Sequence, residues 1–473
     1  MPIRLLAAFL VSAAVSAAEI DVPVRGRVFE GFDSPSPRLA RGADPSAKAA
    51  VGDASRVDLC LRTEYPAPDE FAVWGQRIAG RVSGIVLDGD DTDSEPAVPS
   101  PEFLRALGRV PGIRRLYLDR TLGFTDDHAA AFADGWRDLE EFSLVASRYV
   151  HNVVRRGDAY EAKKRVGNKL PEALSKLPKL RKVRIEYTAM DGAGLSLLAG
   201  MRGLESLRLA DNDVAPAGYA GLASAKGLAS FAADRAGPDV LAALGGLPRL
   251  ASVEIGNLSY RGAEAPFAKL AASPSLASLR FLSPDADDGA LAAIAASKSL
   301  TDVRLRLRAA PVTDAGLAQL LRSCKAVKAL GLASGGGPGA AAALAAVGKE
   351  GAGIEELELG GFDLTPELVA PLASFPGLRR FAACGRRGSP VRNAALKPLG
   401  KSASLRSVGL SWVDGIDPVY LAWIERCPAA DFTVDYLNRS SGGGDEYAVA
   451  GAIKAAKPEA AVRVANPLPW FAP

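Results

Sequence analysis

Few residues in this sequence could carry out acid–base or nucleophilic chemistry. Its histidines and cysteines are His128, His151, Cys60, Cys324, Cys384 and Cys427. They are few and widely spaced, so a histidine-based triad or a histidine-rich metal site is not expected. The sequence also lacks a Cys-x-x-Cys pair, which would indicate a zinc site. Carboxylates such as Glu356 and Glu358 alternate along a predicted strand, where exposed charges are expected in any case. The sequence therefore predicts a protein without catalytic residues, metal or cofactor.

A glycine-rich turn at residues 335–340 follows the pattern of a dinucleotide-binding loop. It comes after a predicted strand and before a predicted helix, and Glu358 lies about twenty residues further on. The same arrangement arises in a repeat array whenever one repeat has a glycine-rich turn. A nucleotide-binding or hydrolytic enzyme is therefore the less favoured alternative.

Basic residues indicate a binding surface more clearly than any residue indicates catalysis, because they recur at one position of successive predicted strands. Side chains at this position lie between inward-pointing apolar residues, so they face the other side of the sheet. An arginine there can bind a carboxylate or phosphate through two hydrogen bonds. The alternative is that the arginines are solvated, or paired with Glu186, Glu205, Glu254 and Asp302. The predicted partner-binding residues of this face are Tyr117, Lys182, Arg184, Arg208, Arg280, Arg304 and Arg306.

A second basic cluster lies in an insertion near residues 146–170. The spacing between Phe142 and Val183 is much longer than the spacing between the other predicted strands. Insertions in a repeat array lie in surface loops, so this segment could steer or clamp a partner. Its predicted contact residues are Arg155, Arg156, Lys163, Lys164 and Arg165.

The stretch from Thr301 to Leu332 shows which elements position these side chains. Val303, Leu305 and Leu307 alternate with polar residues, as in a half-buried strand. Thr313 or Asp314 can cap a helix whose apolar face is formed by Leu317, Leu320 and Leu321. One strand and one helix cannot bury a core alone, so the unit is predicted to stack on copies of itself.

The strand pattern recurs from Val82 to Val434, and from Val183 onward it does so about every 24 residues. With Leu204, Leu207, Leu209 and Asn212 in place, it resembles the leucine-rich repeat, L-x-x-L-x-L-x-x-N/C-x-L. The segment 312–317, followed by Cys324, is similar to the ribonuclease-inhibitor-like and cysteine-containing branches, and we interpret the chain as an exported bacterial member.

This resemblance implies an α/β leucine-rich repeat solenoid, a horseshoe with a parallel β-sheet on the concave face and helices on the convex face. Binding is the usual activity of the family. We predict an N-terminal cap or degenerate repeat at 19–81, including a strand near Leu59, the repeat array at 82–436, and a C-terminal cap at 437–473. Because the cysteines occupy distant repeats, we expect buried thiols rather than disulfides.

The N-terminus is predicted to be a signal peptide over residues 1–18. Arg4 precedes an apolar run, and small residues come before Glu19. A membrane anchor or a buried helix is the alternative. The run is shorter than the ~20 residues of a membrane span, and no later segment is apolar enough, so the mature chain is expected to lack one. We therefore expect a periplasmic, cell-surface or secreted location.

The composition limits the possible partners. With 48% hydrophobic and 23% charged residues and a formal charge of +3, the chain is neither disordered nor broadly basic, so specific nucleic-acid binding is not expected. The leading hypothesis is a non-catalytic exported scaffold that binds a protein on its concave face, where the basic residues would suit an acidic surface. A structural cell-envelope protein is the second hypothesis. The oligomeric state is left open.

Overall fold

The computed structural model describes residues 58–62, 83–88, 98–119, 121, 124–133, 135–145, 166–258, 264–281, 287–307, 313–334, 338–386, 391–412, 423–435 and 446–464. The predicted signal peptide at 1–18 lies outside these residues, as do His151, the glycines at 335–337 and most of the two predicted caps. The five basic residues of the insertion, Arg155, Arg156, Lys163, Lys164 and Arg165, also lie outside them.

The chain forms two compact units, Met1–Ala233 and Asp234–Pro473. The strands of the first are β1 (Asp58–Arg62), β2 (Gly84–Asp88), β3 (Arg115–Asp119), β4 (Glu141–Val145), β5 (Lys182–Glu186), β6 (Ser206–Ala210) and the start of β7 (Ser230–Ala236), whose last residues belong to the second unit. Its helices are α2 (Pro101–Gly108), α3 (Asp126–Ala130), η3 (Ala131–Ala133), α5 (Lys169–Ser175), α6 (Gly192–Ala199) and η5 (Pro216–Ser224). From β1 to β7, each strand pairs in parallel with the next.

The second unit repeats this plan. Its strands are β8 (Ser252–Leu258), β9 (Ser278–Phe281), β10 (Asp302–Leu307), β11 (Ala329–Ser334), β12 (Glu356–Gly360), β13 (Arg380–Cys384), β14 (Ser407–Ser411), β15 (Asp431–Asp435) and β16 (Ala461–Val464). Its helices are α7 (Pro238–Leu244), α8 (Glu264–Ala271), α9 (Asp288–Ala295), α10 (Asp314–Ser323), α11 (Pro338–Glu350), α12 (Pro366–Ala373), η6 (Asn393–Lys401) and α14 (Glu446–Ala456). Consecutive strands again pair in parallel.

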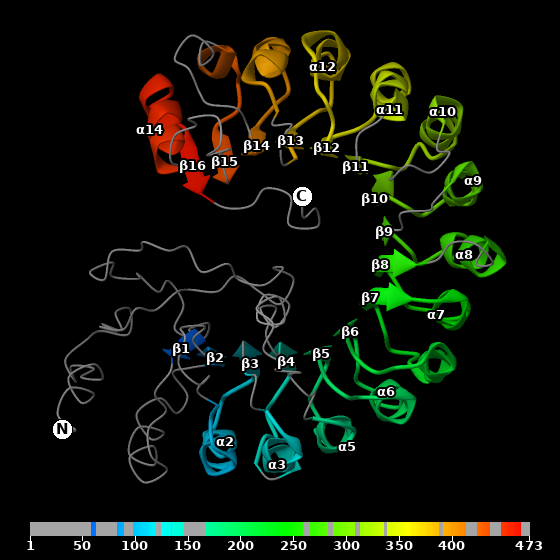
Figure 1. The fold of residues 1–473 in the computed structure, drawn as a ribbon, viewed down its shortest axis with the longest axis vertical. Helices are drawn as coiled ribbons and strands as arrows, with labels where there is room; N and C mark the ends of the chain where they lie inside the picture. Colours follow the sequence, from blue (N-terminus) through cyan, green and yellow to red (C-terminus); the bar gives the residue numbers. More distant parts are fainter. Residues whose placement is uncertain are drawn as a thin grey trace, which may run out of the picture. The chain divides into compact units, whose positions relative to one another are not determined.

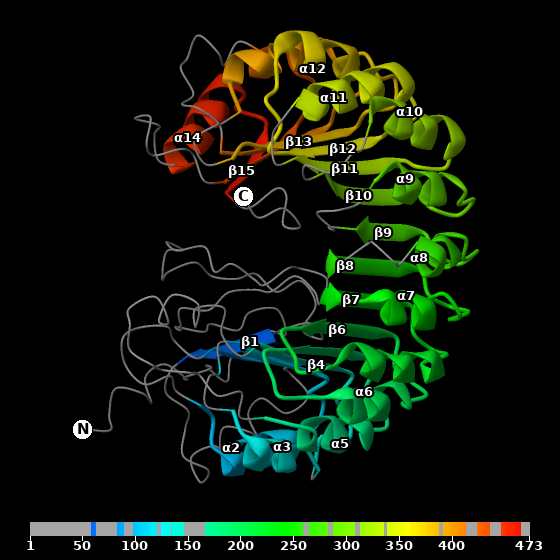
Figure 2. The same ribbon diagram turned by 45° about the vertical axis from the view of Figure 1, so that its right-hand side comes forward.

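Within each unit the helices lie on one side of the strands (Figures 1 and 2). This arrangement is a leucine-rich repeat solenoid, as the resemblance implied. The interior between strands and helices is built from the repeated apolar residues: Val303 and Leu305 of β10 are fully or almost fully buried, and so are Leu317 and Leu320 of α10. The side of each sheet that faces away from the helices is called the open face below.

The repeat around β10 forms as its residues predict. Thr313 is the N-cap of α10, and its hydroxyl accepts a hydrogen bond from the Gly316 amide at 3.0 Å. That bond satisfies one of the amides that a helix start leaves without an intrahelical partner. Asp288 holds the cap in turn, because its carboxylate accepts from both the amide and the hydroxyl of Thr313 at 2.9 and 2.7 Å.

Asn212 fills the role that the repeat pattern gives it. Its Oδ1 accepts from the Thr188 amide at 3.1 Å, and its Nδ2 donates to the Ile185 carbonyl at 2.9 Å. These bonds fix the turn after β5. β4 and β5 pair directly, with Val145 opposite Glu186, so the long insertion between them does not interrupt the ladder.

Two repeats depart from the expected α-helix. η5 and η6 are 3-10 helices, with Pro216 at the start of the first and Pro398 inside the second. The strand predicted near Leu59 is present as β1, paired with β2.

Three cysteines, Cys324, Cys384 and Cys427, are buried thiols rather than disulfides, as predicted. Burial raises the pKa of the Cys324 thiol, and it also raises the pKa of Cys427 more than the Ala429 amide and the charge of Lys457 lower it. Both thiols are therefore poor nucleophiles at neutral pH. Across the parts of the chain that the structure describes, helices are too short or too polar to cross a bilayer.

Candidate functional site

The strand register brings the predicted column of side chains together on the open face. In the first unit Tyr117, Ser143, Arg184, Arg208 and Ala232 occupy equivalent positions of β3 to β7. In the second unit the column runs through Glu254, Arg280, Arg304, Gly331, Glu358, Ala382, Gly409 and Thr433. Neighbouring members lie one strand spacing apart, about 4.8 Å, so long side chains can reach the adjacent strand.

Glu186 holds two of the predicted arginines in the first unit. Its Oε1 accepts from Arg184 Nε at 2.7 Å and from Arg208 Nε at 3.2 Å. Arg184 and Glu186 are buried, whereas the Arg208 side chain keeps about a third of its surface exposed. The arrangement places one buried and one accessible guanidinium on a shared carboxylate.

A second carboxylate in this unit, Glu141, joins the two other predicted residues. Its Oε2 accepts from the Tyr117 hydroxyl at 3.0 Å, and its Oε1 lies 3.1 Å from Lys182 Nζ. The three side chains come from β3, β4 and β5. Lys182 remains about a third exposed, so its ammonium faces both Glu141 and solvent.

In the second unit Arg304 is buried and pairs with two carboxylates. It contacts Asp302 on its own strand, and its Nε donates to Glu358 Oε2 at 2.8 Å. Glu358 belongs to β12, two strands away, and the residue between them in the register is Gly331. Because glycine has no side chain, the Arg304–Glu358 contact can pass over β11.

Glu358 also lies 3.4 Å from Arg380, so it bridges two arginines as Glu186 does. Burial lowers the pKa of the Arg304 guanidinium, but the hydrogen bond to Glu358 and the charges of Glu358 and Asp302 outweigh this effect and raise it. Arg304 is therefore a permanent cation at any physiological pH.

The remaining predicted residues are closer to solvent. Arg280 lies 3.1 Å from Glu254, and its side chain is about a third exposed. Arg306 is half-buried on β10, in register with Ala333. The predicted set thus separates into the buried Arg184 and Arg304 and the accessible Lys182, Arg208 and Arg280. The ion pairs foreseen with Glu186, Glu254 and Asp302 are present, whereas Glu205 lies nearest Arg181, at 3.6 Å.

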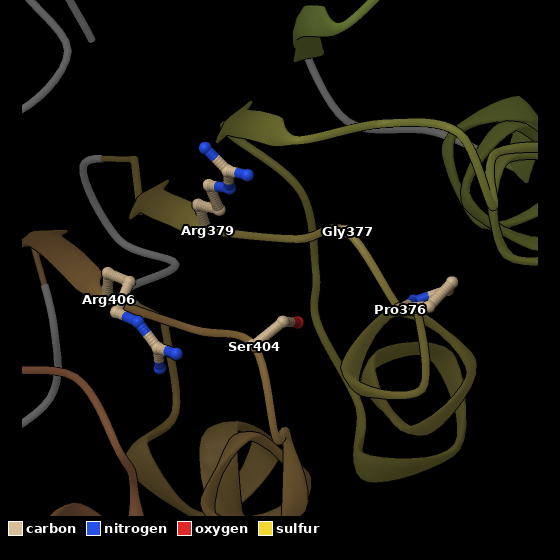
Figure 3. Close-up of a pocket in the computed structure, with 5 residues that line it drawn as sticks. All are labelled: Pro376, Gly377, Arg379, Ser404 and Arg406. Atoms are coloured by element: carbon tan, nitrogen blue, oxygen red, sulfur yellow. The ribbon is translucent and has the colours of Figure 1, made fainter.

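Sequence reasoning did not find the pairing of Arg304 with Glu358. The only signal was the column itself, in which glycine separates an arginine from a glutamate. It also missed a shallow depression of about 410 Å³ lined by Pro376, Gly377, Arg379, Ser404 and Arg406. Figure 3 shows that the two guanidinium groups there do not converge, and Ser404 donates its hydrogen bond to the Phe375 carbonyl at 3.1 Å. These side chains therefore do not form a shared anion clamp.

Histidine could take part in acid–base chemistry, but His128 is engaged in contacts within the fold. His128 Nδ1 accepts from the Thr125 amide at 3.1 Å. Burial lowers the pKa of His128, although Asp127 and Glu102 act in the opposite direction. Within the described ranges, His, Cys, Asp and Glu do not gather in groups of three or more that could hold a metal ion.

Small residues form a separate feature of the open face, here called the small-residue floor: Gly331, Ala333, Gly360, Ala382, Cys384 and Gly409 of β11 to β14. All six are buried. Trp412, directly after β14, packs against Ala333, Ala382 and Cys384.

No family model and no curated protein matches the sequence. Among solved structures, the crystal structure of a complex of Rad7 and Elc1 from yeast is similar with a TM-score of 0.44 and 12% identity, covering 73% of this chain and 83% of that chain. An internalin, InlF, from Listeria monocytogenes has a TM-score of 0.33 and 13% identity, covering 76% of this chain and 93% of that chain. Neither similarity assigns a function to this chain.

Proposed function

We propose that this protein is a non-catalytic scaffold that binds a protein partner through its open face. The observation that carries the proposal is the pairing of Arg208 and Arg280 with carboxylates while each keeps about a third of its surface exposed. Such side chains are already oriented, so they lose less conformational entropy on binding than mobile ones.

The buried charges support this arrangement. Arg184 holds Glu186, which in turn holds the accessible Arg208. Lys182 is positioned by Glu141 in the same way. A partner with carboxylates on its surface would meet the exposed edges of these cations, and charge-assisted contacts of this kind are among the stronger hydrogen bonds.

A charge reversal tests the proposed face. Arg280→Glu places a carboxylate beside Glu254 on the open face, whereas Arg322→Glu does the same beside Glu350 on the helix side. Both arginines lie 3.1 Å from their glutamate, so the two variants are matched. We expect Arg280→Glu to reduce partner capture from producing cells at least tenfold, measured by affinity capture and mass spectrometry. Arg322→Glu should keep capture within twofold. Equal capture by both variants would reject the open face as the binding surface.

We also propose that the protein is exported. The basic start, apolar run and small residues of 1–18 support this location. N-terminal sequencing of the protein from its host should then give Glu19 as the first residue. A protein that keeps Met1 and stays with the cytoplasmic fraction would reject export.

A further inference from the structure

The residue directly before each strand belongs to a row along the edge where the strands begin, here called the entry row. In the second unit backbone hydrogen bonds fix the order of its members. The Glu355 amide donates to the Lys328 carbonyl at 2.8 Å, and the Arg379 amide donates to the Glu355 carbonyl at 2.7 Å. The Arg406 amide donates to the Arg379 carbonyl at 2.7 Å, and the Ala430 amide donates to the Arg406 carbonyl at 3.0 Å. Neighbouring members therefore lie about one strand spacing, about 4.8 Å, apart.

Most charged members of the entry row are matched by an opposite charge on the next strand. In each such pair the basic residue comes first along the chain and the acidic residue precedes the following strand. The pairs are Arg114–Glu140 at 3.8 Å and Arg181–Glu205 at 3.6 Å in the first unit, and Lys328–Glu355 at 3.4 Å in the second. Opposite charges at neighbouring positions stabilise a sheet, so this order is the favourable one.

Arg379 and Arg406 depart from this order, because two cations are neighbours in the row. Both side chains are exposed. Among the residues that the structure describes, neither guanidinium has a carboxylate within ion-pair distance, and Arg406 donates only to the Leu405 carbonyl, at 3.2 Å. Glu355 is already paired with Lys328, and Ala430 carries no charge. Like charges at neighbouring positions are destabilising, so an anion from outside the chain would remove a repulsion that the other pairs avoid.

The surface between the two arginines is hollowed. Both line the shallow depression of about 410 Å³, together with Pro376, Gly377 and Ser404. Figure 3 shows that the two guanidinium groups point away from each other, one on either side of the strand starts. One small anion therefore cannot contact both, whereas two separate carboxylates can each bind one arginine. Pro376 and Gly377 carry no charge, so the depression can receive whatever joins the two carboxylates.

We propose that the entry row at Arg379 and Arg406 binds an acidic peptide segment in an extended conformation, with one carboxylate on each arginine. Side chains on one face of an extended chain are about 7 Å apart at two residues and about 13 Å apart at four. This range suits two arginines whose side chains diverge from neighbouring strands. A longer polyanion such as a nucleic acid fits less well, because Glu355 and Ala430 border the two cations and offer no further positive charge.

This surface lies where the strands begin and not on their open face, so the inference holds whether or not the open face binds a partner. Its test is fluorescence polarisation with the full chain and labelled peptides of serine and glycine. The peptides carry two glutamates two residues apart, two glutamates four residues apart, one glutamate, or two glutamines. Arg379→Gln and Arg406→Gln are compared with Arg181→Gln, which removes the same charge from a paired position of the entry row. Equal urea midpoints establish that the variants are folded.

We expect one of the two-glutamate peptides to bind the native chain about fivefold more tightly than the one-glutamate peptide, which is the effect of one exposed ion pair. Arg379→Gln and Arg406→Gln should each abolish this preference, whereas Arg181→Gln should keep it. A native chain that does not distinguish two glutamates from one would overturn the proposal. So would an equal loss in Arg181→Gln, which would indicate attraction by net charge. Tighter binding of a short oligothymidylate, lost in the same two variants, would also overturn it and identify a phosphate-binding surface.

Discussion

Glu358→Gln tests whether the buried ion pair between Arg304 and Glu358 contributes to the free energy of unfolding. The substitution keeps the shape of the side chain and removes its charge. Glu358 has only 3% of its side chain exposed, accepts from Arg304 Nε at 2.8 Å and lies 3.4 Å from Arg380. The neutral amide would leave Arg304 buried with Asp302 as its carboxylate neighbour.

The cost follows from that environment. Removing one partner of a buried ion pair costs about 3–5 kcal/mol, because the remaining charge is left uncompensated. Arg304 keeps Asp302, so its charge is partly balanced, and the loss is closer to that of one charge-assisted hydrogen bond, about 1.5–3 kcal/mol. We therefore expect a loss of about 2–3 kcal/mol. With a urea dependence of about 2–3 kcal/mol/M, the midpoint falls by about 1 M.

Urea unfolding followed by circular dichroism measures this loss. Because repeat arrays can unfold in parts, hydrogen exchange of the β10 to β12 amides gives a local reading of the same effect. The control is the double variant Arg304→Met/Glu358→Leu, which removes both charges and leaves Arg380 half-exposed beside Glu356. It should regain most of the lost stability, since apolar replacements of buried ion pairs are often neutral.

The reasoning is refuted if Glu358→Gln changes the free energy of unfolding by less than about 0.5 kcal/mol. That result would mean that water reaches the pair and screens it. A double variant that loses as much stability as the single variants Arg304→Met and Glu358→Leu together would also refute it, because the two charges would then act independently.

Four further predictions follow from the described contacts. Gly331→Val puts a branched side chain on the path between Arg304 and Glu358 and should cost about 1–3 kcal/mol in urea unfolding, whereas Gly353→Ala, with open space around its added carbon, should cost much less. Gly192→Ala would bring a methyl group to 2.7 Å from the Gly218 backbone and should lower Tm, while Gly200→Ala, with ordinary contacts, should change it little. Thr313→Ala removes the cap of α10 and should cost about 1 kcal/mol in thermal unfolding. Since burial lowers the folded pKa of His128, its stabilising effect is complete above its unfolded pKa of about 6.5 and is lost as the pH falls below it; His128→Gln should therefore reduce the drop in Tm between pH 7.5 and 5.5.

The fold could be predicted because each repeat must bury the same positions. Val303, Leu305 and Leu317 pack against the equivalent residues of adjacent repeats. The spacing of these residues therefore predicted both the strand and the helix. The same logic gave the Thr313 cap. It failed at η5, which is a 3-10 helix where the repeat pattern predicts an α-helix.

The open-face column could be predicted, but its pairing could not. Which residues share a face follows from alternation along a strand, whereas which of them touch depends on side-chain length and on the residue between them. Arg304 reaches Glu358 because Gly331 leaves the way open, and this required the register of three strands. The burial of Arg184 and Arg304 also could not be deduced, since equivalent strand positions carry accessible arginines.

Stability alone does not explain charges at buried open-face positions, because apolar residues of similar volume would serve as well there. What apolar residues cannot do is orient a neighbouring cation. Glu186 is held by Arg184 and presents its carboxylate to Arg208, and Glu358 is held by Arg304 and lies beside the half-exposed Arg380. In both units a buried arginine fixes a carboxylate that positions an arginine nearer solvent. If this orientation serves recognition, Glu186→Gln should weaken partner capture more than it lowers Tm, whereas a purely structural role would lower both together.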